Sequence, residues 1–124
     1  MRQIKKILIA EDELLVAKVL IMTLEKRSFK VTHVIDEASA IKMASEFQPD
    51  LIILDIHLKN KTNGIKAGKE IRKNGLKCPI IFTTGNSFEQ TKLEISDIDN
   101  CYLFIKPIDS EQLLKHIDLY LVNS

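Results

Sequence analysis

The stretch "LIILD", residues 51–55, is the most informative part of the chain, because four apolar residues run directly into a carboxylate. A short and continuously apolar run is typical of a strand covered on both faces of a sheet. Asp55 is then either an ordinary turn residue or a carboxylate held at the mouth of the sheet for chemistry. Asp55 alone does not separate these two interpretations, and the residues around it in the chain are needed to decide.

Similar short apolar runs recur along the chain. They are "KILIA" (6–10), "KVTHVI" (30–35), "LIIL" (51–54), "IIFT" (80–83) and "YLFI" (102–105). Four of them are nearly continuous, which predicts strands covered on both faces, whereas the stronger alternation in 30–35 predicts an edge strand.

The segments between these runs have apolar residues near helical spacing. They predict helices at 13–26, 37–47, 64–74, 87–96 and 110–122. Asp109 is expected to cap the last helix, with Gln112 at its third position. Alternating strands and helices with right-handed crossovers predict an α/β, doubly wound, five-stranded parallel sheet. The expected strand order is 2-1-3-4-5, as in flavodoxin-like folds, with ligands at the carboxyl ends of the strands.

Length and composition predict one domain, 1–124, of an ordinary globular protein. The formal net charge of +1 gives no argument for nucleic acid or an anionic membrane as a direct partner. No apolar run approaches the roughly 20 residues that span a bilayer. The start "MRQIKKILIAED" has too short an apolar run for a signal peptide, so we expect a cytoplasmic protein. Cys78 and Cys101 fit no metal spacing and are expected to be reduced thiols.

Polar residues follow four of the predicted strands, and the expected strand order brings them to one edge of the sheet. They are Glu11, Asp12 and Glu13 after the first strand, Asp55 after the third, Thr84 after the fourth and Lys106 after the fifth. Carboxylates this close repel one another, and oxygen ligands favour Mg²⁺, with Mn²⁺ as the alternative. A metal, a lysine and a hydroxyl together suit a phosphoryl group. Asp55 would be the nucleophile that forms an aspartyl phosphate.

The same residues resemble the receiver domain of two-component response regulators, of the chemotaxis-regulator-like type, over essentially the whole chain. The motifs are "ILIAEDE", "LIILDIHL", "PIIFTTG" and "YLFIKP". Each motif is weak alone, and their order, each at a strand end, makes the resemblance specific.

The resemblance implies a role for each matching position. Glu11 and Asp12 would be the acidic pair and Asp55 the phosphorylated residue, with the backbone carbonyl of His57 as a further Mg²⁺ ligand. Thr84 and Lys106 would contact the phosphoryl group. In this family the peptide bond corresponding to Lys106–Pro107 is typically cis.

The resemblance also implies partners. A sensor histidine kinase or a histidine phosphotransfer protein would supply the phosphoryl group, and the domain would catalyse its own phosphorylation and dephosphorylation. A downstream protein would read the surface built from the helix at 87–96, the strand at 102–105 and the helix at 110–122.

Two positions depart from the family pattern. Lys59 stands where many receivers have proline, and Leu103 stands where the family carries an aromatic switch residue. The expectation is a smaller switching movement, or replacement of the aromatic by Tyr102 or Phe104.

Other interpretations of these residues stay open at this point. Glu11 and Asp12 have capping of the next helix as an alternative role, Glu13 is assigned to that helix's first turn, and His116 is expected to be a solvated surface residue. The alternative function is a receiver-like interaction module that phosphorylation does not regulate. A flavin-binding electron carrier is the least favoured interpretation.

Overall fold

The structure is a computed structural model that describes residues 3–58, 62–85 and 88–122. Strands and helices alternate strictly along the chain. They are β1 (Lys6–Ala10), α1 (Leu14–Lys26), β2 (Lys30–Val34), α2 (Glu37–Phe47), β3 (Leu51–Asp55), α3 (Gly64–Lys73), β4 (Ile80–Thr84), α4 (Phe88–Glu94), β5 (Cys101–Ile105) and α5 (Ser110–Val122). The predicted elements are all present, and most boundaries differ from the prediction by no more than a residue or two. The predicted start of the fourth helix, residue 87, lies outside the described part.

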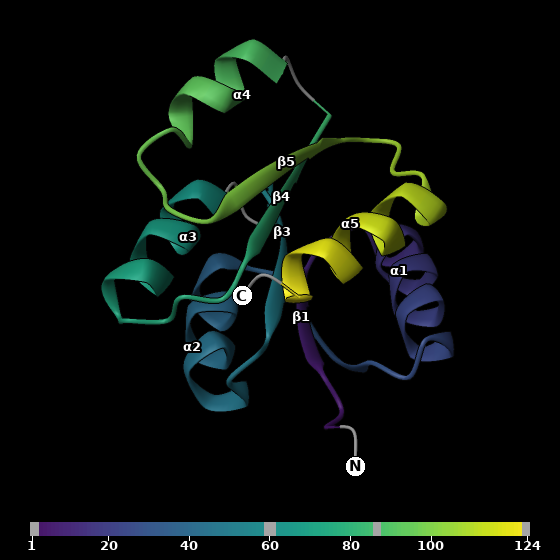
Figure 1. Ribbon diagram of the computed structural model, residues 1–124. Coiled ribbons are helices and arrows are strands. Elements are labelled where there is room, and N and C mark those ends of the chain that lie inside the picture. The colour runs from purple at the N-terminus through teal and green to yellow at the C-terminus, as the bar shows by residue number, and fades with distance from the viewer. Residues whose placement is uncertain (1–2, 59–61, 86–87, 123–124) are drawn as a thin grey trace.

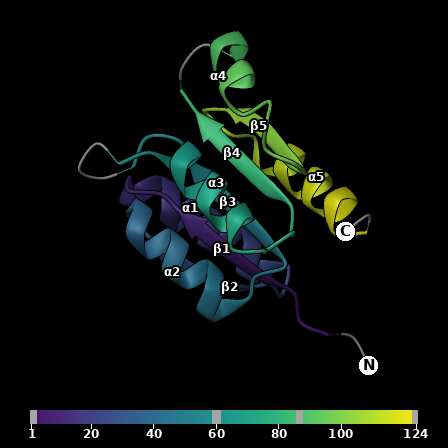
Figure 2. The same ribbon diagram turned by 90° about the vertical axis from the view of Figure 1, so that its left-hand side faces the viewer.

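The five strands form one parallel sheet in the order β2-β1-β3-β4-β5. Figures 1 and 2 show the helices in two layers, with α1 and α5 on one face and α2 and α3 on the other. This arrangement confirms the predicted doubly wound, flavodoxin-like α/β fold. Within the described ranges, no helix combines the length and the apolar character needed to cross a membrane.

The alternation of side chains along the strands divides the core into two parts. Ile53 and Ile81 pack in the cluster that includes residues of α1 and α5. Leu54 and Phe82 pack in the cluster that includes residues of α2 and α3. Gly68 makes the second packing possible, because a Cβ there would lie 2.6 Å from the Phe82 ring. Side chains two residues apart in a strand point to the same face of the sheet. Asp55 therefore points to the same face as Ile53, and Thr84 points to the opposite face, with Phe82.

The sheet edges agree only partly with the prediction. β2 is an edge strand with half-buried side chains, as its alternation predicts. The expectation that residues 102–105 are covered on both faces is wrong: β5 is the other edge, its side chains are half-buried, and Ile105 is 39% exposed. The physical reason is that helices cover the outermost strand of a sheet less completely than its centre.

The helix ends show which polar residues act as caps. Asp109 caps α5 as predicted, because its Oδ1 accepts hydrogen bonds from the backbone N–H groups of Glu111 and Gln112. The N-cap of α1 is Glu13, which makes no side-chain capping bond, so neither Glu11 nor Asp12 is the N-cap residue of this helix.

Two cysteines and one histidine are partly buried by their neighbours. Cys78 and Cys101 are free and half-buried, in line with the prediction, and burial raises the pKa of the Cys78 thiol to about 11. His116 is not simply solvated: its ring packs edge-on against Phe104 with 5.2 Å between ring centroids, and its Nδ1 lies 2.7 Å from the carbonyl oxygen of Gln112.

Candidate functional site

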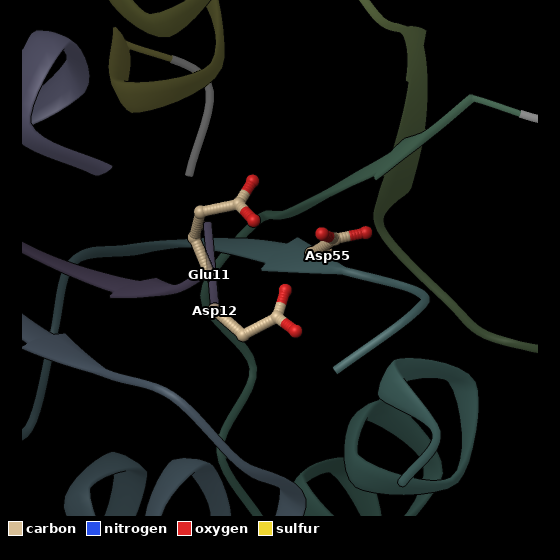
Figure 3. Close-up of side chains that lie close together, drawn as sticks. All are labelled: Glu11, Asp12 and Asp55. Atoms are coloured by element: carbon tan, nitrogen blue, oxygen red, sulfur yellow. The ribbon is translucent and has the colours of Figure 1, made fainter. Parts of the chain in front are cut away.

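Three carboxylates meet at the carboxyl ends of the neighbouring strands β1 and β3 (Figure 3). Glu11 and Asp12 follow β1, and Asp55 is the last residue of β3. One oxygen from each lies within 4.8 Å of the others. Glu11 and Asp55 are only 2% and 3% exposed, so the site is a buried concentration of negative charge.

Lys106 neutralises part of this charge. Its Nζ lies 2.8 Å from Asp55 Oδ2, 2.9 Å from Glu11 Oε1 and 3.3 Å from Glu13 Oε1. Burial lowers the pKa of Lys106, but the hydrogen bonds and charges of Asp55 and Glu11 outweigh it and raise this pKa well above its usual range. The amine is therefore a permanent cation beside Asp55.

The pKa of the Glu11 carboxyl group is raised above its usual value. Burial raises its pKa from 4.5 to about 7, while Lys106 and the backbone N–H of Glu13 lower it and Asp55 raises it further. The carboxyl group thus changes charge near neutral pH, where a cation at the site would favour its ionised form.

The backbone after β3 is held close to Asp55. The His57 N–H donates to Asp55 Oδ1 at 3.1 Å, and the Gly64 N–H donates to the Ile56 carbonyl at 2.8 Å. A Cβ at Gly64 would overlap the Asp55 carbonyl and lie 2.9 Å from the Ile56 Cα. The absence of a side chain at Gly64 therefore allows the start of α3 to lie against the backbone of Asp55 and Ile56. Lys59, the first departure from the family pattern, lies outside the described residues.

Thr84 is fully buried at the end of β4, and its carbonyl accepts the backbone N–H of Lys106 at 2.8 Å. Leu103 packs in the same half of the core as Phe82, on the side that Thr84 continues. Tyr102 and Phe104 pack in the opposite half; Tyr102 stacks on Tyr120 of α5. Replacement of the family's aromatic by either residue is therefore wrong for this structure, because adjacent strand residues face opposite ways.

The structure thus brings Glu11, Asp12, Asp55 and Lys106 together, with Thr84 one strand away and the His57 backbone adjoining Asp55. Sequence reasoning missed two contacts of this site. Glu13, assigned only to the first turn of the helix, also forms an ion pair with Lys106. His33, on β2, places Nε2 2.7 Å from the Glu11 carbonyl oxygen. The run of acids at 11–13 was a signal for Glu13, whereas no local pattern indicates His33.

The donor set fits a hard divalent cation. Carboxylate oxygens are the ligands that Mg²⁺ prefers, and Mg²⁺ is commonly bound by one or two carboxylates with water completing the shell. Among the described residues, three converging carboxylates and one adjoining lysine leave a negative charge for a cation to balance.

Comparison with known proteins agrees with this geometry. Residues 7–118 match the model of the response regulator receiver domain. The chain is 36% identical over 89 residues to the alkaline phosphatase synthesis transcriptional regulatory protein PhoP of Bacillus subtilis, covering 72% of this chain and 37% of that protein. It is 35% identical to the response regulator ArlR of Staphylococcus saprophyticus, covering 90% of this chain and 50% of that protein. The chain thus spans half or less of the length of these relatives.

Solved structures give the same result. The receiver domain of sensor histidine kinase PA1611 from Pseudomonas aeruginosa, with a magnesium ion coordinated in its active site cleft, has a TM-score of 0.85 and 26% identity, covering 96% of this chain and 98% of that one. The Vibrio cholerae chemotaxis protein CheY4 shares the fold, with a TM-score of 0.87, 22% identity, and coverage of 95% and 99%. On this evidence the chain belongs to the response regulator receiver domain family of two-component signalling systems.

Proposed function

We propose that Asp55 is the phosphoacceptor of this receiver domain and that Lys106 and Thr84 contact the transferred phosphoryl group. The observation that carries the proposal is the 2.8 Å contact between Asp55 and Lys106 at the carboxyl edge of the sheet. A carboxylate nucleophile next to a fixed cation has the charge arrangement that phosphoryl transfer needs.

The reaction would proceed from a phosphohistidine on a partner. An oxygen of Asp55 forms a bond to phosphorus, the P–N bond breaks, and its electron pair returns to the imidazole nitrogen. Lys106 is held on the site by buried carboxylates and would donate to a phosphoryl oxygen. Thr84 ends the neighbouring strand, and its hydroxyl would donate to another oxygen.

Magnesium, with manganese as the alternative, would be held by Glu11, Asp12, Asp55 and the backbone carbonyl of His57. The support is the set of three oxygens within 4.8 Å of one another. When bound, the cation supplies positive charge that offsets the phosphoryl and carboxylate charges. The protein's own contribution is to fix these ligands, which the short backbone contacts around Asp55 favour.

The partner that donates the phosphoryl group would be a sensor histidine kinase or a histidine phosphotransfer protein. A hollow beside the site could accommodate this donor protein. Leu15 and Val19 of α1 line the hollow together with Pro107, and Glu13 and Lys106 lie at its border toward Asp55. Leu15 is 81% exposed and Val19 is 57% exposed, so an apolar helix of the donor would bury them while bringing its histidine to Asp55.

The downstream partner would bind α4, β5 and α5. Exposed apolar side chains support this surface: Leu93 is 75% exposed, Leu119 54% and Ile105 39%. Tyr102 contributes only in part, because it is half-buried against Tyr120. The side chain of Phe88, a further residue expected at this surface, lies outside the described part. Leu103 fills less space than an aromatic residue, so we expect only a small movement of β5.

Direct contact with nucleic acid or membrane is not part of the proposed function of this domain. The names of two relatives describe transcriptional regulators, and the chain spans half or less of those proteins, so no role in transcription is assigned to this domain. An intracellular, cytoplasmic location is proposed from the similarity of the chain to response regulators.

Phosphorylation is tested by incubating the chain with Mg²⁺ and acetyl phosphate and measuring intact mass. We expect a gain of one phosphoryl group in the wild type and none in Asp55→Asn. Asp118→Asn, the same change at an exposed position of α5, is the matched control and should retain the gain. An unchanged gain in Asp55→Asn would overturn the assignment, and no gain in the wild type would favour an interaction module that phosphorylation does not regulate.

The downstream surface is tested separately by hydrogen exchange with and without beryllofluoride, a phosphoryl mimic. Protection is expected to change across 84–105. Changes restricted to the neighbours of Asp55 would show that signalling does not pass through this face.

A further inference from the structure

The ammonium group of Lys106 donates hydrogen bonds to Asp55 Oδ2 at 2.8 Å and Glu13 Oε1 at 3.3 Å, and it forms an ion pair with Glu11 Oε1 at 2.9 Å. Its Nζ lies within 3.3 Å of oxygens of Asp55, Glu11 and Glu13. A phosphoryl oxygen next to Lys106 would therefore compete with these carboxylates for the N–H donors of its ammonium group.

Burial distinguishes Glu13 from the other two carboxylates. The side chains of Asp55 and Glu11 are each 3% exposed, and neither reaches water without rearrangement of the site. The side chain of Glu13 is 64% exposed, and its 3.3 Å contact is the longest of the three. An exposed ion pair has little net stability, so Glu13 can exchange Lys106 for water at low cost.

The side chain of Glu13 has no capping role in α1. Glu13 is the N-cap residue, yet its carboxylate makes no capping bond to the helix. Only its backbone is engaged there: its carbonyl accepts from the Ala17 N–H, and its N–H donates to Glu11 Oε2. The carboxylate can therefore move away from Lys106 without breaking a capping interaction.

We propose that Glu13 is a positioning residue that competes with the incoming phosphoryl group for Lys106. This inference rests on the proposed function of Asp55. In the unphosphorylated protein Glu13 accepts a hydrogen bond from Lys106 and adds negative charge where an anionic phosphodonor must approach. When an Asp55 oxygen bonds to phosphorus and acetyl phosphate loses acetate with the P–O electron pair, Lys106 redirects that hydrogen bond to a phosphoryl oxygen.

The test compares Glu13→Gln with Glu25→Gln, which removes the same charge from an exposed position on the same helix. Time courses of intact mass with acetyl phosphate and Mg²⁺ give the phosphorylation rates. We expect Glu13→Gln to be about 3- to 10-fold faster than wild type at low salt, with Glu25→Gln unchanged. The gain should shrink at high salt, because the effect is electrostatic.

A second measurement does not depend on turnover. Beryllofluoride binding, followed by thermal melting in the presence of Mg²⁺, should be tighter in Glu13→Gln than in wild type or Glu25→Gln. Equal binding in the three proteins, or a rate gain that salt does not reduce, would overturn the role of Glu13. If the wild type takes no phosphoryl group at all, the failure lies instead in the proposed function.

Discussion

Replacing Lys106 with methionine should destabilise the protein through the carboxylates that it leaves behind. Methionine keeps most of the length of the side chain and removes the charge. Glu11 and Asp55 then lose an ammonium group at 2.9 and 2.8 Å, although both remain almost fully buried. The loss is expected to come from uncompensated charge rather than from packing.

The size of the effect follows from burial. Removing one partner of a buried ion pair costs about 3–5 kcal/mol. The Lys106 side chain is 18% exposed, and Glu11, with a pKa of about 7, can take up a proton, so we expect about 2–3 kcal/mol near pH 8. For a chain of this length that free energy corresponds to a fall in Tm of roughly 6–15 °C.

The pH dependence has a definite sign. In the wild type the folded state binds the Glu11 proton more tightly than the unfolded state, because the pKa is raised from 4.5 to about 7. The free energy of unfolding therefore falls as pH rises through this window. Without Lys106 the fall should be steeper, and stability should recover toward pH 5 as Glu11 becomes protonated.

Urea unfolding followed by circular dichroism at pH 8 and pH 5.5, with and without Mg²⁺, measures these effects. Lys115→Met, at an exposed position on α5, is the matched control. Mg²⁺ should stabilise Lys106→Met more than the wild type, because it binds the carboxylates of the folded state. The reasoning is refuted if the two variants unfold at the same urea concentration at both pH values and respond equally to Mg²⁺.

Three further predictions concern the same site. The affinity for Mg²⁺, measured by calorimetry, should rise between pH 6 and 8 as Glu11 loses its proton near pH 7, and Glu11→Gln should flatten this dependence. Asp12→Ala should weaken Mg²⁺ binding and leave the metal-free protein at least as stable, because it relieves repulsion; equal affinities would show that Asp12 is not a ligand. Gly64→Ala should cost about 1–3 kcal/mol in urea unfolding through overlap with the backbone of β3, whereas Gly85→Ala, which meets no atom within 4 Å, should cost much less.

The local sequence predicts most of the fold. Apolar runs of strand length and helical spacing between them are visible without knowledge of any contact, and "KVTHVI" reveals an edge strand by its alternation. The handedness of crossovers then restricts the sheet order. Because the carboxyl ends of parallel strands share one edge, the placement of Asp55, Glu11, Asp12 and Lys106 together also follows from the order of the elements.

The contacts between elements required the tertiary structure. The bond of His33 to the Glu11 carbonyl depends on the register of β1 and β2, and the reach of Glu13 to Lys106 depends on how α1 begins over the sheet. Strand alternation places Leu103 and Phe104 on opposite faces, but which of the two meets α5 is decided by how β5 packs. The spacing of residues along one strand or helix indicates which of its faces is buried. The register between strands and the orientation of each helix on the sheet are set by packing between elements that are distant in sequence. That packing determines which donor each carboxylate reaches.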